Sequence, residues 1–293
     1  MLDFLLAPLA YTFMQRALIA SVLVGGLCAI VGCYVVLRGM AFLGDALAHA
    51  ILPGVAIAFL LGGDLFVGAL VTAIVVAIGI GYLGRGGQVR EDTAIGVIFS
   101  GTLALGVVLI SSAGSYQADL THILFGNVLG VTDRDLVLTL GFGAVVLAIV
   151  IVLYNAFLIF TFDPTFAATL RLPTGALRYL LMILLAVTVV VSLQTVGVAL
   201  VAALLVTPPA AASLLTRRLS RMMLVSAAIG MLSSIAGLYV SFYVHVSTGA
   251  SIVLTCTALF TLALVFSPRD GVLARYRIER QFRRSGGTRI IES

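Results

Sequence analysis

An acid and an imidazole stand four residues apart in an otherwise apolar part of this chain. The stretch "MAFLGDALAHAILPGVA", residues 40–56, carries Asp45 and His49. At this spacing both side chains project from one face of a helix and can converge on one point. A carboxylate with an imidazole is a ligand set that suits manganese, iron, zinc or cobalt. The same pair could instead relay protons, or hold a broken helix by hydrogen bonding, and the spacing alone does not choose.

The chain contains two further histidines, and both stand near candidate membrane boundaries. His122 lies in the polar connection 113–135, where an interface-seeking polar residue would explain it as well as a metal ligand does. His245 lies in "SFYVHVSTGAS", at the outer end of an apolar run. A ligand and a purely structural residue are both open interpretations of His245.

The composition places these residues in a membrane protein. Of the 293 residues, 61% are hydrophobic and 10% are charged, and the mean hydropathy is +1.21. Soluble domains are about 45–50% apolar and about 25% charged. An ionised Asp in the middle of a membrane helix costs at least about 2.5–3.5 kcal/mol, so we expect Asp45 to face a water-filled cavity, a partner group or a cation.

Apolar runs of about 20 residues, the length that crosses a bilayer core, predict an all-α, polytopic transmembrane helical bundle of eight or nine spans. The candidate spans are approximately 14–36, 40–62, 65–83, 93–112, 136–160, 177–194, 197–215, 222–243 and 250–267. We expect Pro208 and Pro209 to break the seventh of these. An eight-span variant with a merged or half-inserted segment stays open.

The basic residues predict the orientation. All seventeen are Arg, and seven of them lie in the segment 269–293. If this tail is cytoplasmic, an odd number of spans puts the N-terminus outside, and only Arg16 and Arg134 then lie on the outer side, as the positive-inside rule requires. We therefore expect a transmembrane domain over 1–268 and a basic cytoplasmic tail that contacts anionic lipid rather than nucleic acid.

Two connections carry more than a turn. The outer connection 113–135 contains an apolar piece too short to span, which predicts a re-entrant or interfacial segment. In the inner connection 161–176, Asp163 can cap a helix that begins with Pro164. The apolar residues Phe166, Leu170 and Leu172 follow. This pattern predicts a short cytoplasmic helix exposed to a partner, or one that packs only on its own subunit.

The sequence lacks the motifs of a self-sufficient pump or an enzyme. It has no Walker A pattern, no Gly-rich loop after a strand and no His-Glu-x-x-His pair, each of which would supply phosphate binding or metal-assisted hydrolysis. The energy for transport must then come from an ion gradient or from a separate ATPase that binds the cytoplasmic loops.

Several stretches together resemble the permease subunits of bacterial metal-uptake ABC transporters, the family called ABC-3, which serves manganese, zinc and iron. The resemblance covers nearly the whole chain in the expected order. It rests on "VVLRGMAFLGDALAHAILPGVA" (35–56), "REDTAIGVIFSGTLALGVVLISS" (90–112), "DLTHILFGNVLGV" (119–131), "FDPTFAATLRLP" (162–173), "TVGVALVAALLVTPPAAASLL" (195–215) and "GLYVSFYVHVSTGASIVL" (237–254).

The resemblance implies residue roles that the spacing did not establish. Asp45 and His49 match the acid and histidine that line the translocation path in the family. His245 stands where many members have an acid, and we assign it to the metal path or to a position behind the ligands. The coupling helix that contacts the ATPase in this family would here consist of Asp163, Pro164, Phe166, Ala167 and Leu170.

The resemblance also implies the assembly. Two permease subunits would work with two cytoplasmic ATPase subunits and an extracytoplasmic metal-binding lipoprotein, with ATP on the partner subunit and no permanently bound cofactor. The expected cargo is manganese, with zinc and iron open. Two rivals remain: a permease for siderophores or cobalamin, and a proton-coupled secondary transporter that uses Asp45 and His49 as relay groups.

Overall fold

The computed structural model describes residues 8–84, 90–112 and 128–267. Within these ranges, nine helical segments are long and apolar enough to cross a membrane, which confirms the all-α bundle and favours nine spans over eight. They are α2 (Thr12–Leu37), α3 with α4 (Phe42–Ala50 and Leu52–Leu60), α5 (Leu65–Leu83), α6 (Glu91–Ser112), α8 (Asp133–Val152), α11 (Thr174–Val196), α12 (Val198–Leu215), α13 (Leu219–Val244) and α14 (Thr248–Phe266).

Four shorter elements complete the described part of the chain: η1 (Pro8–Ala10), η3 (Val128–Gly130), α9 (Tyr154–Phe162) and α10 (Pro164–Thr169). His122, most of the predicted re-entrant segment and the tail 269–293 lie outside the described residues.

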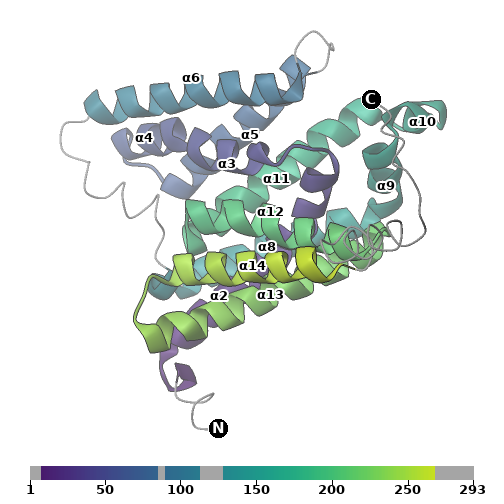
Figure 1. Ribbon diagram of the computed structural model, residues 1–293. Helices are drawn as coiled ribbons and strands as arrows, with labels where there is room; N and C mark the ends of the chain where they lie inside the picture. Colours follow the sequence, from purple (N-terminus) through teal and green to yellow (C-terminus); the bar gives the residue numbers. More distant parts are fainter. Residues whose placement is uncertain (1–7, 85–89, 113–127, 268–293) are drawn as a thin grey trace, which may run out of the picture.

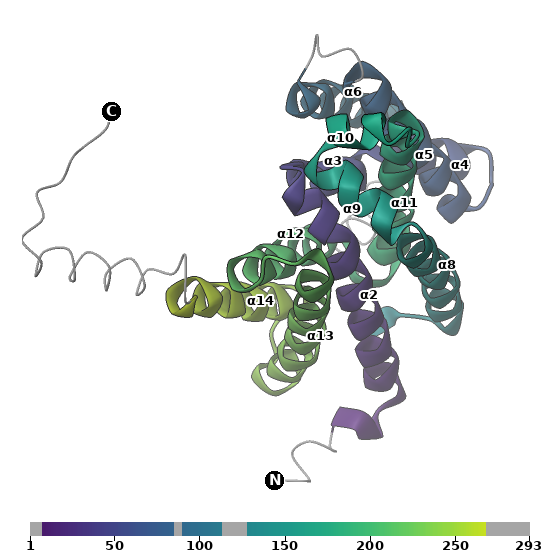
Figure 2. The same ribbon diagram turned by 90° about the vertical axis from the view of Figure 1, so that its right-hand side faces the viewer.

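The spans pack in two groups that share α2, α11 and α12. In one group α2, α12, α13 and α14 pack against one another, and in the other α3 to α6 pack together, with α5 and α8 against α11 (Figure 1). Figure 2 shows the same division from the side. Helix α2 lies deepest, since 72% of its most apolar window is buried, whereas the corresponding figure for α6 is 17%.

Two boundaries differ from the sequence prediction. The predicted span 136–160 is two helices, because α8 ends at Val152 and α9 begins at Tyr154 as a separate element. The predicted break at Pro208 and Pro209 is wrong: α12 runs through both prolines from Val198 to Leu215.

The packing of α12 on α2 explains how the helix tolerates its prolines. Pro209 has no N–H to donate to the carbonyl of Leu205, four residues earlier. That carbonyl and the Pro209 ring lie against Gly32 of α2, where a Cβ atom would collide with both. Close approach of helices at small residues is a common mode of packing in membranes. Gly32 therefore leaves room for the irregular backbone that the prolines create.

We predict that Gly32→Ala destabilises the protein by about 1–3 kcal/mol, the usual cost of overpacking a core. The thermal midpoint in detergent measures the effect. Gly141→Ala is the matched control, because Gly141 is a helical glycine whose added methyl group would meet nothing within 4 Å. Equal midpoints for the two variants would contradict this account of α12.

Candidate functional site

The site begins with a break in the second span. Helix α3 ends at Ala50 and α4 begins at Leu52, with Pro53 in the first turn of α4. Pro53 cannot donate a backbone hydrogen bond to the carbonyl of His49, so regular helical bonding stops one turn after that residue. Gly44 packs against Leu205 of α12 and fixes α3 on the core. The local sequence thus places Asp45 and His49 on a short helix held from behind.

Asp45 and His49 lie side by side on α3. His49 Nε2 is 3.7 Å from Asp45 Oδ1. The His49 side chain is 32% exposed and the Asp45 side chain is 51% exposed. The His49 ring meets the Phe99 ring of α6 in an edge-on arrangement, with centroids 6.0 Å apart. One carboxylate and one imidazole therefore remain accessible on the surface of a single copy, as donors for a cation or as a proton-accepting pair.

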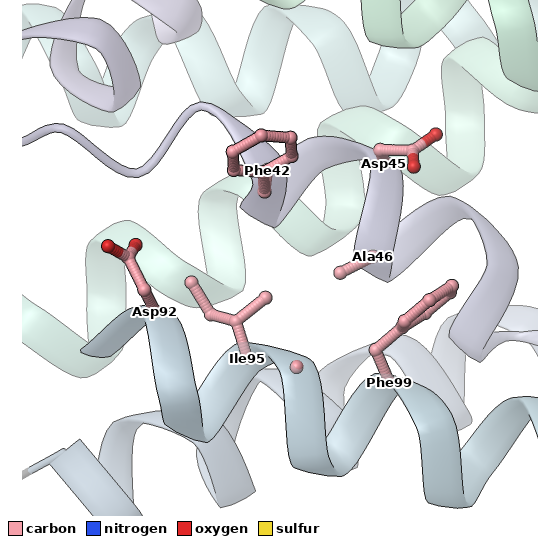
Figure 3. A pocket seen from close by; sticks show the side chains of 7 residues that line it. Phe42, Asp45, Ala46, Asp92, Ile95 and Phe99 are labelled. Atoms are coloured by element: carbon pink, nitrogen blue, oxygen red, sulfur yellow. The ribbon is translucent and has the colours of Figure 1, made fainter. Parts of the chain in front are cut away.

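A cavity of about 220 Å³ lies beside this pair, between α3 and α6. Phe42, Asp45 and Ala46 of α3 line it opposite Asp92, Ile95, Gly96 and Phe99 of α6 (Figure 3). Asp92 did not stand out in the sequence, because an acid in the first turn of a helix is explained by the helix dipole alone. In the sequence "RED" (90–92), directly before an apolar span, nothing indicates that Asp92 faces a cavity.

Among the residues that the structure describes, no three His, Cys, Asp or Glu side chains gather in one place. Asp45 and His49 could supply at most two ligands, fewer than a transition metal takes from a stable site. Water or a second copy of the chain must supply the rest if the pair binds a metal ion.

The structure does not bring His245 to Asp45 and His49. His245 ends α13 in the left-handed conformation, with φ 58°. It lines a separate cavity of about 400 Å³ with Met14 and several aromatic and aliphatic residues. Counting the spans along the chain puts the α13–α14 connection, which contains His245, at the opposite end of the bundle from the α2–α3 connection. Figure 1 shows the same placement of the α13–α14 connection.

The short helix predicted in the connection 161–176 is present as α10. Asp163 caps it, accepting a hydrogen bond of 2.8 Å from the backbone N–H of Phe166, and Pro164 takes the first helical position. Ala167 is fully buried, whereas Phe166 and Leu170 are 52% and 49% exposed. Helix α10 therefore presents two apolar side chains outward while Ala167 anchors it to the core.

An apolar bundle that crosses the membrane many times, with polar donors on a broken helix and a capped surface helix at one end, is the architecture of a transport permease. Residues 10–267 match the family model of the ABC 3 transport family. The chain belongs to this family, which confirms the family expected from its motifs. It is a multi-pass membrane subunit of a bacterial transport system and not an enzyme.

Named relatives extend along nearly the whole chain. The manganese transport system membrane protein MntC of Halalkalibacterium halodurans is 49% identical over 268 residues, which cover 92% of each chain. The chelated iron transport system membrane protein YfeD of Yersinia pestis is 40% identical over 260 residues, 89% of this chain and 87% of that protein.

Two solved structures share the fold. PsaBC from Streptococcus pneumoniae, solved in complex with Fab, superimposes with a TM-score of 0.82 at 39% identity and covers 95% of this chain and 99% of its own. A metal-chelate type ABC transporter in an inward-facing conformation gives a TM-score of 0.67 at 16% identity, over 85% of each chain. At that identity the second likeness concerns the fold alone.

We predict that Asp163→Ala frays α10, because loss of an N-cap costs about 1 kcal/mol. Hydrogen exchange of the Phe166 amide should become roughly fivefold faster, the factor that corresponds to this free energy. Asp163→Asn keeps a capping oxygen and is the control. Unchanged exchange in the Ala variant would mean that the cap does not hold the helix.

Proposed function

We propose that this chain is the permease of an ATP-driven importer of divalent transition metal ions, with manganese as the favoured cargo and zinc or iron as alternatives. Two copies would form a homodimer, and the ion would cross at the interface between them. The observation that carries the proposal is the accessible pair of Asp45 and His49 on a membrane-spanning helix.

The exposure of Asp45 argues for a second copy. An ionised carboxylate that is about half exposed cannot face hydrocarbon without a large penalty. The neighbouring Phe42 is 76% exposed and lies on the same short helix. A two-fold axis beside α3 would cover both residues and bring together two carboxylates and two imidazoles, because such an interface uses the same patch twice.

The donor set is compatible with manganese, and the more similar of the two relatives described above is named for manganese. Carboxylate oxygens and imidazole nitrogens suit manganese, iron and zinc, and the affinity order at such ligands favours the later metals, so selectivity must also come from delivery. Of the two relatives described above, one is named for manganese and one for chelated iron. The metal ion is cargo, so its ligands should be few and exchangeable.

The partners would divide between the two membrane faces. Cytoplasmic ATPase subunits would bind α10 through the exposed Phe166 and Leu170. Asp163 and Pro164 would shape the start of this helix, and the buried Ala167 would hold it on the core. An extracytoplasmic metal-binding lipoprotein would dock at the opposite end, near His245, which would contact the entering ion. The N-terminus would lie outside. Residues 1–268 form the permease domain, and the basic tail 269–293 lies in the cytoplasm beside anionic lipid.

Transport would follow alternating access. The binding protein releases an ion into the space between the two copies, where the Asp45 and His49 side chains offset part of its lost hydration. ATP-driven closure of the ATPase subunits moves α10 and repacks the spans. The chain itself hydrolyses nothing.

The first test is uptake of radioactive manganese by proteoliposomes that contain this chain, its genomically adjacent ATPase and its binding protein. We expect ATP-dependent uptake, which Asp45→Asn reduces at least about tenfold, because even partners that only support metal ligands cost about 10–100-fold when replaced. The control is Asp133→Asn, which removes only a surface ion pair with Arg16. Wild-type uptake by the Asp45 variant would remove Asp45 from the path.

The same vesicles separate the rival functions. Uptake of zinc alone would retain the permease and replace the metal. Uptake in a proton gradient without the ATPase would establish the secondary transporter. Uptake of metal chelates but not of free ions would establish a siderophore-type permease.

Phe166→Asp should prevent the ATPase from co-purifying with the permease. An exposed aromatic that anchors an interface contributes about 2 kcal/mol or more, so affinity should fall roughly 30-fold. Leu215→Asp, which adds the same charge at an apolar residue 43% exposed at the same end of the bundle, is the control. A complex that still assembles and transports after Phe166→Asp would contradict the role of α10.

A further inference from the structure

A partly buried ionic cluster joins helices next to α10 to a helix that lines the cavity beside Asp45. We name it the arginine junction and define it as Arg38, Glu91, Phe160 and Arg178. The Arg38 side chain is only 9% exposed, and its Nη2 is 3.6 Å from Glu91 Oε1. The Arg38 guanidinium carbon also lies 4.4 Å from the centre of the Phe160 ring. This position combines an ion pair with a cation–π contact.

Arg178 shares the same carboxylate. Its Nη2 is 3.3 Å from Glu91 Oε1, and its Nη1 donates a hydrogen bond of 3.1 Å to the carbonyl of Gly84. The arginine junction therefore joins the end of α2, the start of α6, the last turn of α9 and the start of α11, and it also reaches the end of α5.

Two residues of the arginine junction flank α10 in the chain. Phe160 precedes Asp163, the cap of α10, by three residues, and Arg178 lies in the first turns of the helix that follows α10. Both segments that carry α10 thus end at the junction. A displacement of α10 cannot reach the bundle through its own chain without passing Phe160 or Arg178.

On the other side the arginine junction includes the start of α6, one wall of the cavity, and the end of α2, which leads into α3, the other wall. Arg38 ends α2, a few residues before α3 and Asp45. Glu91 begins α6 and is followed directly by Asp92, which lines the cavity opposite Asp45. The junction thus joins both supports of α10 to the start of α6 and to the short connection that leads into α3.

The pairing within the arginine junction is incomplete. Two guanidinium groups share one carboxylate, and the buried Nη1 of Arg38 has no hydrogen-bond partner among the described residues. Burial lowers the pKa of Arg38, and the nearby Glu91 opposes this shift. Buried ion pairs add little stability compared with apolar packing, and an unpaired buried donor is costly. Stability alone therefore does not account for the cluster.

We propose that the arginine junction transmits the movement of α10 to α3 and α6, with Arg38 as the positioning residue that links the Phe160 ring to the cavity beside Asp45. The proposal rests on the proposed function, because it requires an ATPase bound to α10. When α9 moves, the Phe160 ring moves against the Arg38 guanidinium, and the Arg38–Glu91 pair carries the shift to the start of α6. A planar cation serves this contact better than a point charge does.

The test measures ATP hydrolysis and manganese uptake together in proteoliposomes that hold the full complex. Arg38→Lys keeps the charge but loses the planar face, and Phe160→Leu keeps apolar bulk but loses the ring. We expect each variant to retain ATP hydrolysis and to consume about 2- to 30-fold more ATP per manganese ion, the range for residues along a coupling network. Arg221→Gln, at an exposed arginine in the first turn of α13, should leave the ratio unchanged.

The double variant identifies the contact. Because both substitutions break the same interaction, Arg38→Lys with Phe160→Leu should raise the ratio no further than the larger single effect. Should Arg38→Lys fail to assemble, Phe160→Leu alone decides. An unchanged ratio, or a proportional loss of hydrolysis and uptake, would overturn the proposal. Wild-type vesicles without ATP-dependent uptake would instead overturn the proposed function, and the variants play no part in that outcome.

Discussion

A carboxylate on a membrane-spanning helix cannot be left facing hydrocarbon, and this constraint shapes the bundle around α3. Asp45 stands about half exposed on one copy, so α3 must be fixed precisely enough for another group to cover it. Three local features supply that precision. Gly44 packs directly on Leu205 of α12, Pro53 ends regular bonding after His49, and the Phe99 ring of α6 lies edge-on to the imidazole. Asp45 and His49 project from this fixed helix, and its open side is the face that the proposed second copy would cover.

Backbone groups face the same constraint as side chains, because lipid offers them no hydrogen bonds. The two prolines of α12 leave carbonyls without their helical donors, and the chain accommodates this by contact between helices rather than by unwinding. The carbonyl of Leu205 lies against Gly32, and α2 also approaches α13 closely where Gly25 meets Gly230. Lipid is as apolar as the side chains, so the hydrophobic effect does not drive helices together within the membrane. Close van der Waals packing at small residues has to supply the free energy of helix association instead. In α2, the most buried span described, a Cβ atom at Gly25 or at Gly32 would collide with the backbone of a neighbouring helix.

Local patterns were sufficient to predict what depends on neighbours in the chain. Run lengths gave the spans, and Asp163 with Pro164 gave the cap and first turn of α10. Interhelical placement was not predictable, because spans that are apolar all round carry no stripe to indicate which face meets which helix. The continuous helix through Pro208 depends on a glycine more than 170 residues away in sequence. Asp92 and Arg38 were overlooked for the same reason. The cavity that Asp92 lines and the carboxylate that pairs with Arg38 are formed with residues far away in the sequence. The separation of His245 from Asp45 likewise follows only from the assembled bundle.

Helix α6 connects the two ends of the proposed mechanism. Glu91 binds both arginines of the arginine junction at its start. Asp92, the next residue, and Phe99, about two turns further on, line the cavity. Yet only 17% of its most apolar window is buried, the smallest share among the described spans. Its few buried contacts include Gly106, which packs on Leu52 and Pro53 near the break in the second span. Elements with few buried contacts move at the lowest cost in free energy. A displacement of α6 would therefore change the cavity beside Asp45 while the core of α2, α11 and α12 keeps its packing.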